Sequence, residues 1–130
     1  MIKEYTKRDH ETLHFVDELN PHFNIVNGEI QTNCGTIAVL TMGVAIVMGA
    51  SRIFAVGMDG YAGMAGKDRF HFYEEKVEPE EQDLIIERQR WNQKFLEEID
   101  QYLIQRGQEG IHIITPTSHK SFYKGIENYI

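Results

Sequence analysis

The chain has 130 residues, a hydrophobic fraction of 42% and a charged fraction of 25%, which suits one globular domain with a modest core. Its net charge of −7 argues against non-specific binding to nucleic acid or anionic membrane, since both need clustered Lys and Arg. The single cysteine, Cys34, allows no intrachain disulfide, and the first ten residues lack the apolar core of a signal peptide. We therefore expect a cytoplasmic protein.

The first elements are predicted from local signals. HETLHFVDEL at 10–19 is expected to form one or two helical turns. In FNIVNGEIQT, at 23–32, apolar residues flank Asn27-Gly28, a dipeptide that favours a two-residue hairpin turn. One irregular strand is the alternative for this segment.

The clearest unit is the apolar stretch IAVLTMGVAIVMGA at 37–50. It is shorter than the about 20 residues that span a bilayer, so we expect no membrane span. We predict instead a helix from Thr36 to Met48, capped by Asn33 or Thr36 and ended by Gly49 in the left-handed conformation. Because this helix is apolar nearly all round, it should be buried on most sides.

A short strand follows in RIFAVGM at 52–58, with the unalternating apolar pattern of a central parallel strand. Residues 58–79 are predicted to be a long loop. A second helix is expected over 79–105, stopped by Gly107. A stripe of apolar residues at helical spacing gives it one buried face: Leu84, Trp91, Phe95, Ile99 and Leu103.

The C-terminal part is predicted to hold a buried strand in GIHIITPT at 110–117 and a last helix from Ser118, which would cap it. Strands that alternate with helices predict an α/β domain over residues 1–130, with a parallel sheet and helices on both faces. Two clear strands are few for such a sheet. The chain therefore looks like half of a doubly wound domain, or like the C-terminal domain of a larger protein.

Three polar segments lie where such a fold binds ligands, beyond strand ends and at a helix start. TNCGT at 32–36 opens the first helix and could bind an anion or only cap that helix. GMDGY at 57–61 follows a strand, and Asp59 could accept a bond from a sugar hydroxyl or only form an Asx-turn. TPTSHK at 115–120 follows the other strand and could face the same crevice as Asp59, although a turn with a Ser118 cap is favoured.

Two further side chains are considered for chemistry. His71, in DRFHFYEE at 68–75, could act as a general base because its ordinary pKa lies near neutrality, but a solvated loop is the favoured interpretation. Cys34 is interpreted as a small buried residue rather than a nucleophile. No second histidine at useful spacing supports a metal site, and no cofactor is expected.

The run NCGTIAVLTMGVAIVMGASRIFAVGMDGY, at 33–61, resembles the central motif of the bacterial sialyltransferases. It is also similar to motility-accessory glycosyltransferases and 6-hydroxymethylpterin diphosphokinase-like proteins. The shared pattern is a Gly-containing helix entry, an Ala-rich helix, a Gly-small turn, a strand and Gly-x-Asp-x-Tyr. The similarity extends more loosely over residues 30–127, including ITPTSHK near the end.

The resemblance implies a Rossmann-like, three-layer glycosyltransferase fold with a short parallel sheet and no metal requirement. It implies that the chain binds a nucleotide or nucleotide-sugar and serves sugar transfer or surface-glycan biosynthesis, with His71 as the loosely matched catalytic base. The predicted ligand-binding residues are Asn33, Gly35, Thr36, Asp59, Gly60, Tyr61, Thr117 and Ser118.

The chain departs from the family in three respects. It lacks the glycine-asparagine-glycine nucleotide loop of the family's N-terminal half, Cys34 stands where Ser or Thr is usual, and Gly60 replaces the aromatic residue before Tyr61. Half of the donor site is therefore missing, so whether the chain is an enzyme stays open. The alternative is a non-catalytic module that binds a ligand, forms a homodimer or docks on a partner domain of a larger sugar-processing or aldolase-like enzyme.

Overall fold

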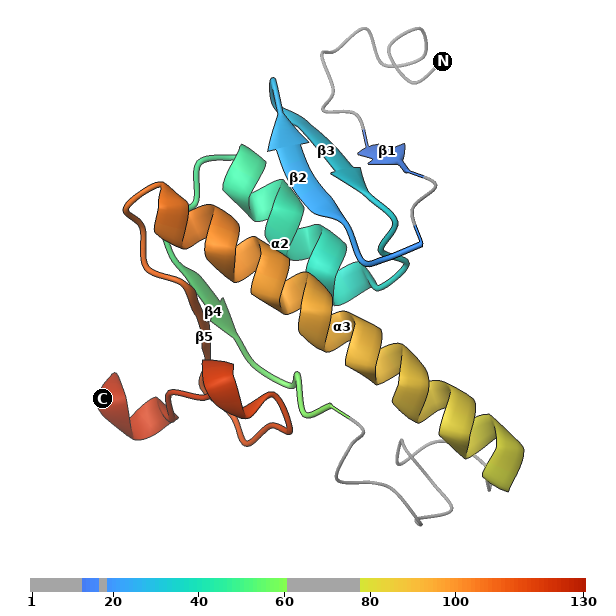
Figure 1. Ribbon diagram of the computed structural model, residues 1–130. Coiled ribbons are helices and arrows are strands. Elements are labelled where there is room, and N and C mark those ends of the chain that lie inside the picture. The colour runs from blue at the N-terminus through green and yellow to red at the C-terminus, as the bar shows by residue number, and fades with distance from the viewer. Residues whose placement is uncertain (1–12, 17–18, 61–77) are drawn as a thin grey trace, which may run out of the picture.

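The computed structural model describes residues 13–16, 19–60 and 78–130. Within these ranges, two α-helices and five short strands make a mixed α/β structure with two small sheets. Figure 1 shows the two helices lying side by side between these sheets. Apolar residues from both sheets and both helices share one buried cluster, so this helix pair forms the centre of the core.

The first sheet consists of β1 (Leu13–Phe15), β2 (Phe23–Val26) and β3 (Glu29–Thr32). β2 and β3 form the predicted hairpin, and Asn27 and Gly28 both have positive φ, 53° and 78°, as a type I′ turn requires. The single irregular strand is therefore ruled out. The predicted helical turns at 10–19 are wrong for Leu13–Phe15, which instead pair in parallel with β3 because that strand offers an open edge.

Helix α2 (Ile37–Val47) confirms the predicted helix with its end at Gly49. Gly49 has φ 96°, its N–H donates to the Ile46 carbonyl, and the Ala50 N–H donates to the Ala45 carbonyl, which is a Schellman motif. The predicted side-chain cap is wrong: Thr36 occupies the N-cap position, but its side chain makes no capping bond.

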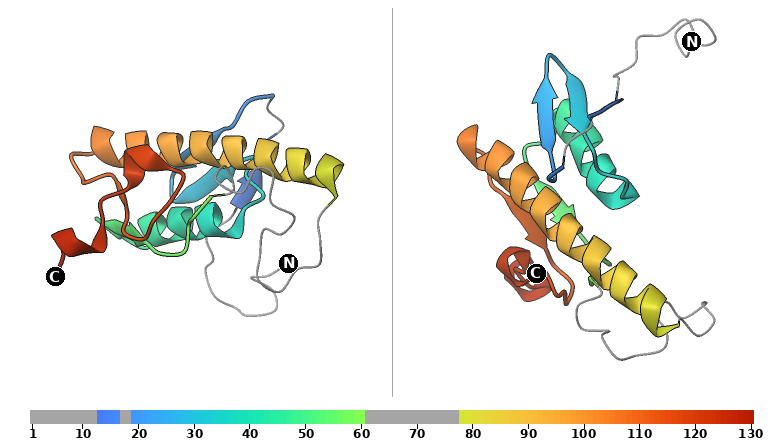
Figure 2. Two further views of the ribbon diagram at one scale, coloured as in Figure 1. Left: turned by 90° about the horizontal axis from the view of Figure 1, so that it is seen from below. Right: turned by 45° about the vertical axis from the view of Figure 1, so that its right-hand side comes forward.

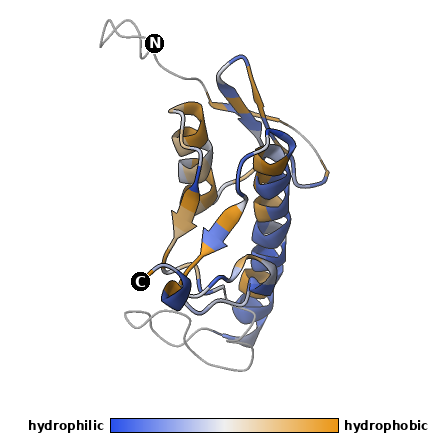
Figure 3. Ribbon diagram, turned by 90° about the vertical axis from the view of Figure 1, so that its left-hand side faces the viewer, coloured by the Kyte–Doolittle hydropathy of each residue, from blue (hydrophilic) through white to orange (hydrophobic). Residues whose placement is uncertain are grey.

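The expected burial of α2 on most sides is also wrong. Only Val39, Met42 and Gly43 are buried, because the sheet beside the helix is too narrow to cover its remaining surface. Ile37 and Met48 are about four-fifths exposed, at 79% and 81%. Figure 3 shows α2 apolar along its length, whereas α3 is mostly hydrophilic on its outer face.

The second sheet pairs β4 (Ile53–Ala55) in parallel with β5 (Ile111–Ile113). Ile53, Ala55, Ile111 and Ile113 point into the core, which follows from the alternation of side chains along a strand. Within the described chain β4 has no other neighbour. Among the described residues it is therefore an edge strand, not the central strand that its apolar run predicted.

Helix α3 (Pro79–Gln105) has the predicted bounds and connects the two strands of this sheet. It begins with Pro79 at its first position and ends before Gly107, whose φ is 71°. Phe95, Ile99 and Leu103 of the predicted stripe are buried, whereas Leu84 and Trp91 are partly exposed. Figure 2 shows α3 running along the whole molecule.

The predicted last helix from Ser118 is wrong. The chain forms two 3-10 turns instead, η2 (Lys120–Phe122) and η3 (Ile126–Asn128). Gly125, with φ 72°, separates them and prevents a continuous helix. Beyond η3, Tyr129 contacts the rings of Phe54 and His112 on the outer face of the β4–β5 sheet. Both α-helices of the described chain thus lie on one face of this sheet, not on both.

Candidate functional site

The carboxyl ends of β4 and β5 form one polar edge, as the pairing of parallel strands dictates. The Gly57 N–H donates to Thr115 Oγ1 at 3.0 Å, and the Ser118 N–H donates to the Asp59 carbonyl at 2.6 Å. These bonds hold the segment after β4 against the segment after β5. GMDG at 57–60 and TPTSHK at 115–120 therefore face each other, as one interpretation of the sequence expected.

Thr117 is the central residue of this edge. It is 5% exposed, and its hydroxyl donates to the Met58 carbonyl. The same oxygen accepts the backbone N–H of His119 at 3.1 Å. Thr117 thus serves both segments at once, and its hydroxyl is already engaged within the protein.

Gly60 permits the close approach of the two segments. Its φ is 71°, and a Cβ at this position would lie 1.9 Å from Ser118 Oγ. A side chain would therefore be strained and would also clash. Packing in this chain therefore requires glycine at position 60.

Asp59 is exposed at the same edge. Its backbone carbonyl accepts the Ser118 N–H, whereas its carboxylate makes no hydrogen bond within the described ranges. The Asx-turn considered for this residue would be closed by the N–H of Tyr61, which lies outside the described residues. The carboxylate is exposed to solvent at the carboxyl end of β4, beside the segment after β5.

His119 lies beneath this edge and is 5% exposed. Its Nδ1 is 2.6 Å from Gln93 Oε1 on α3. Burial lowers the pKa of His119 below the ordinary histidine value, because desolvation disfavours the charged imidazolium. The side chain is thus a neutral imidazole at neutral pH.

The segment before α2 is held by its own polar groups. Asn33 Oδ1 accepts the His22 N–H at 2.9 Å, and Asn33 Nδ2 donates to the Asn20 carbonyl. Gly35 is exposed, and a Cβ there would meet nothing within 4 Å. Asn33 therefore organises the chain before β2, while Gly35 leaves the entry to α2 open.

Cys34 and Thr36 complete this segment. Cys34 is fully buried, and burial raises the pKa of its thiol, so the neutral thiol predominates and the interpretation as a small buried residue is confirmed. Thr36 Oγ1 donates to Asn92 Oδ1 at 2.6 Å. Its hydroxyl binds α3 instead of the first amides of α2.

Two consecutive amide residues of α3 therefore hold both polar segments. Asn92 binds Thr36 before α2, and Gln93 binds His119 after β5. Sequence reasoning missed these two residues and favoured a turn with a Ser118 cap for the segment that contains His119. Asn92 could have been found from the sequence, because it lies between Trp91 and Phe95 of the apolar stripe. A polar side chain that is buried there needs a hydrogen-bond partner.

Two predicted site residues, Tyr61 and His71, lie outside the described residues. No cluster of three or more metal-ligating side chains occurs within the part of the chain that the structure describes. In the same part, no helix is long and apolar enough to cross a membrane.

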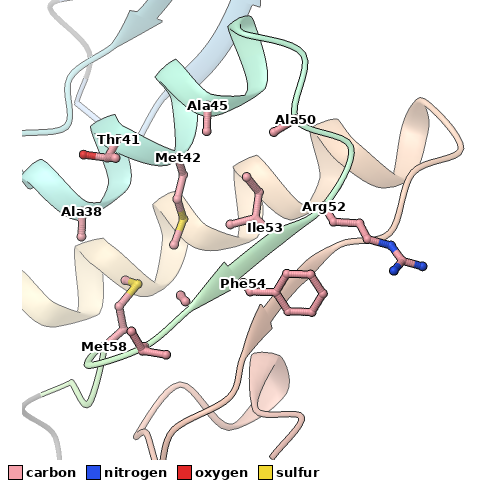
Figure 4. A pocket seen from close by; sticks show the side chains of 11 residues that line it. Ala38, Thr41, Met42, Ala45, Ala50, Arg52, Ile53, Phe54 and Met58 are labelled. Carbon is pink, nitrogen blue, oxygen red and sulfur yellow. The ribbon is translucent and has the colours of Figure 1, made fainter. Parts of the chain in front are cut away.

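A separate apolar groove of about 460 Å³ lies between α2 and the free edge of β4. Figure 4 shows Ala38, Met42 and Ala45 of α2 facing it from one side and Ile53 from the other. Arg52 and Met58 mark its two ends. The small alanine side chains leave this space open, so the groove is continuous with the exposed surface of α2.

No family model, curated protein or solved structure matches the chain.

Proposed function

We propose that the chain is a Rossmann-like module that binds a nucleotide or nucleotide-sugar and takes part in sialyltransferase-like sugar transfer for surface-glycan biosynthesis. The observation that carries the proposal is the shared polar edge at the carboxyl ends of the parallel strands β4 and β5. Open α/β sheets bind ligands at this edge. The proposal includes a cytoplasmic location, in keeping with the single cysteine.

The exposed groups at this edge suit a sugar or ribose. The Asp59 carboxylate can accept hydrogen bonds from hydroxyl groups, and it has no hydrogen-bond partner within the described ranges. Gly60 lets Ser118 approach the backbone closely, so that the segments after β4 and β5 meet beside Asp59. The Thr117 hydroxyl joins the two segments that form this edge.

The start of α2 suits the phosphate of such a ligand. No side chain caps this helix, so the N–H groups of its first turn keep their capacity to bind an anion. Gly35 before the helix is exposed and has open space around it. A phosphate can therefore be bound without any Lys or Arg, which is compatible with the acidic chain.

A thermal-shift measurement tests the proposal with CMP, UDP, GDP, ATP and CMP-sialic acid as probes. A ligand that binds only the folded chain at one hundred times its Kd stabilises that state by about 2.7 kcal/mol. We expect one nucleotide to raise Tm, and Asp59→Asn to weaken this shift. Glu98→Gln, the same change of charge on exposed α3, is the control. No shift with any probe would contradict the proposal.

A second candidate function is dimerisation of a non-catalytic module, favoured by the uncharged surface of α2. Ile37, Val44 and Met48 are exposed on this helix, and within the described ranges β4 pairs on one side alone. Exposed apolar faces of this kind mark interaction sites. With a net charge of −7, two copies repel each other least through a face that carries no acidic side chain.

Light scattering after size-exclusion chromatography tests this candidate at two protein concentrations. We expect a dimer that Val44→Lys dissociates. Gln101→Lys adds the same charge on the exposed side of α3 and should leave the dimer intact. A monomer at both concentrations would exclude the dimer and leave this face for a partner domain.

A further inference from the structure

His119 is the buried titratable side chain of the polar edge, and none of the roles described above uses its second ring nitrogen. The residue follows β5 and lies beside Gly60, which follows β4. Its Nε2 is 3.3 Å from the position that a Cβ on Gly60 would occupy. The imidazole therefore reaches from the interior to the segment at which the ligand is proposed to bind.

The neighbours of Gln93 fix which nitrogen of His119 carries the proton. Gln93 Nε2 donates to Glu97 Oε1 at 2.9 Å, and a carboxylate can only accept. Gln93 Oε1 must then be the atom that faces His119 Nδ1 at 2.6 Å. Because an amide oxygen also only accepts, Nδ1 carries the proton.

The neutral imidazole therefore has an unprotonated Nε2. Within the described ranges this atom makes no hydrogen bond, although the residue as a whole is only 5% exposed. Gln93 links the ring to the carboxylate of Glu97, and Lys120 follows His119 in the sequence. Nothing among these interactions occupies the lone pair of Nε2.

We propose that His119 is the general base of the site and accepts the proton of a hydroxyl group through Nε2. This inference rests on the proposed function in sugar transfer, and it gives to His119 the role that the sequence assigned to His71. As the acceptor oxygen bonds to the anomeric carbon, its proton passes to Nε2. The bond from that carbon to the donor phosphate breaks, and the phosphate leaves with the electron pair. The imidazolium then returns its proton to water.

The positions of Thr117 and Gln93 give the base a defined orientation. The Thr117 hydroxyl binds the backbone N–H of His119, and Gln93 binds its side chain. A general base is effective when its proton-accepting atom is held within hydrogen-bond reach of the substrate. Thr117 and Gln93 are thus positioning residues, and only His119 would touch the acceptor.

The first experiment determines the tautomer of His119 by long-range proton–nitrogen NMR on the full chain labelled with ¹⁵N-histidine. We expect a proton on Nδ1 and none on Nε2 at neutral pH. Gln93→Met, which lacks the acceptor oxygen, should abolish this preference. A proton on Nε2, or a charged ring at neutral pH, would overturn the proposal.

The second experiment measures the hydrolysis of CMP-sialic acid, with water as the acceptor. His119→Asn keeps a donor near Gln93 but lacks Nε2, and it should lower kcat by about 10²-fold or more, as loss of a general base does, with little change in KM. Because a buried substitution can impair folding, Gln93→Glu is the second variant. Its carboxylate should move the acidic limb of the pH–rate profile to higher pH.

The outcomes separate this inference from the proposed function. Hydrolysis that His119→Asn leaves unchanged, or a pH profile that Gln93→Glu does not move, would overturn the base and leave the nucleotide site standing. If the thermal-shift probes and CMP-sialic acid all fail to bind the unmodified chain, both proposals fall. A defined tautomer with both expected kinetic effects would support His119 as the base.

Discussion

At the scale of single residues, the polar edge depends on one buried hydroxyl. Thr117 donates to the Met58 carbonyl and accepts the His119 N–H. Thr117→Val keeps the shape of the side chain but leaves both backbone groups without this partner. Loss of a buried partner costs about 1–3 kcal/mol, so we expect the free energy of unfolding to fall by that amount in urea titrations. Thr117→Ser retains the hydroxyl, so its free energy of unfolding should fall clearly less. Equal losses of stability in the two variants would contradict this role of the hydroxyl.

His119 gives the folded state a defined dependence on pH. Burial lowers its pKa from the ordinary value of 6.5, so the unfolded chain binds this proton more readily than the folded one. The free energy of unfolding should therefore rise as pH increases from the lowered pKa to 6.5, and then level off. Urea unfolding between about pH 5 and pH 8 tests this, and His119→Asn should show a smaller slope. Identical slopes in both proteins would refute the assignment.

Only part of the site at this scale could be predicted from the sequence. Residues 57–60 and 115–118 face each other, which the sequence allowed as one alternative because the ends of parallel strands meet at one edge. The roles of Asn92 and Gln93 were not, because their partners Thr36 and His119 are 56 and 26 residues away in the sequence. Hydrogen bonds over such separations leave no local pattern.

At the scale of the elements, Gly43 lets the first sheet approach α2. A Cβ at this position would lie 3.0 Å from the ring of Phe23 and 3.3 Å from Ile30, and both of these side chains are buried. Gly43→Ala gains helix propensity of about 1 kcal/mol, but overpacking a core costs about 1–3 kcal/mol. We expect a net loss of about 1 kcal/mol from these two terms.

Chemical denaturation of Gly43→Ala measures this balance. Gly35→Ala is the matched control outside the helix, because a Cβ at Gly35 would meet nothing within 4 Å. A stabilised Gly43→Ala variant would mean that the Phe23 ring shifts at little cost.

The element boundaries were predicted well where the signals are local. Asn27-Gly28 gave the turn of the hairpin, and Gly49 and Gly107 gave the ends of α2 and α3. The prediction of a last helix was wrong because Gly125 adopts a positive φ between the two 3-10 turns. The strand Leu13–Phe15 was predicted as helical turns because its structure depends on pairing with β3, which lies elsewhere in the sequence.

At the scale of the whole molecule, the helix pair lies between two sheets that neither periodicity nor composition could assign. β3 and β4 flank α2 in the sequence, an order that favours a single parallel sheet. They belong instead to different sheets, because β3 pairs with β1 and β2. The sequence therefore predicted the α/β class and most elements, but neither the division of the strands between two sheets nor the pairing of β1 with β3.

The strand pair β4–β5 has three residues in each strand, yet it brings together parts of the chain that are far apart. Gly57 and Thr115, which bond beyond the strand ends, are 58 residues apart in the sequence. Closing so long a segment has an entropic cost that few backbone bonds offset. This pair should therefore open before the rest of the fold. A small molecule held between Asp59 and Ser118 would tie the two ends together as a non-covalent crosslink, and would slow amide exchange across the entire β4–β5 pair.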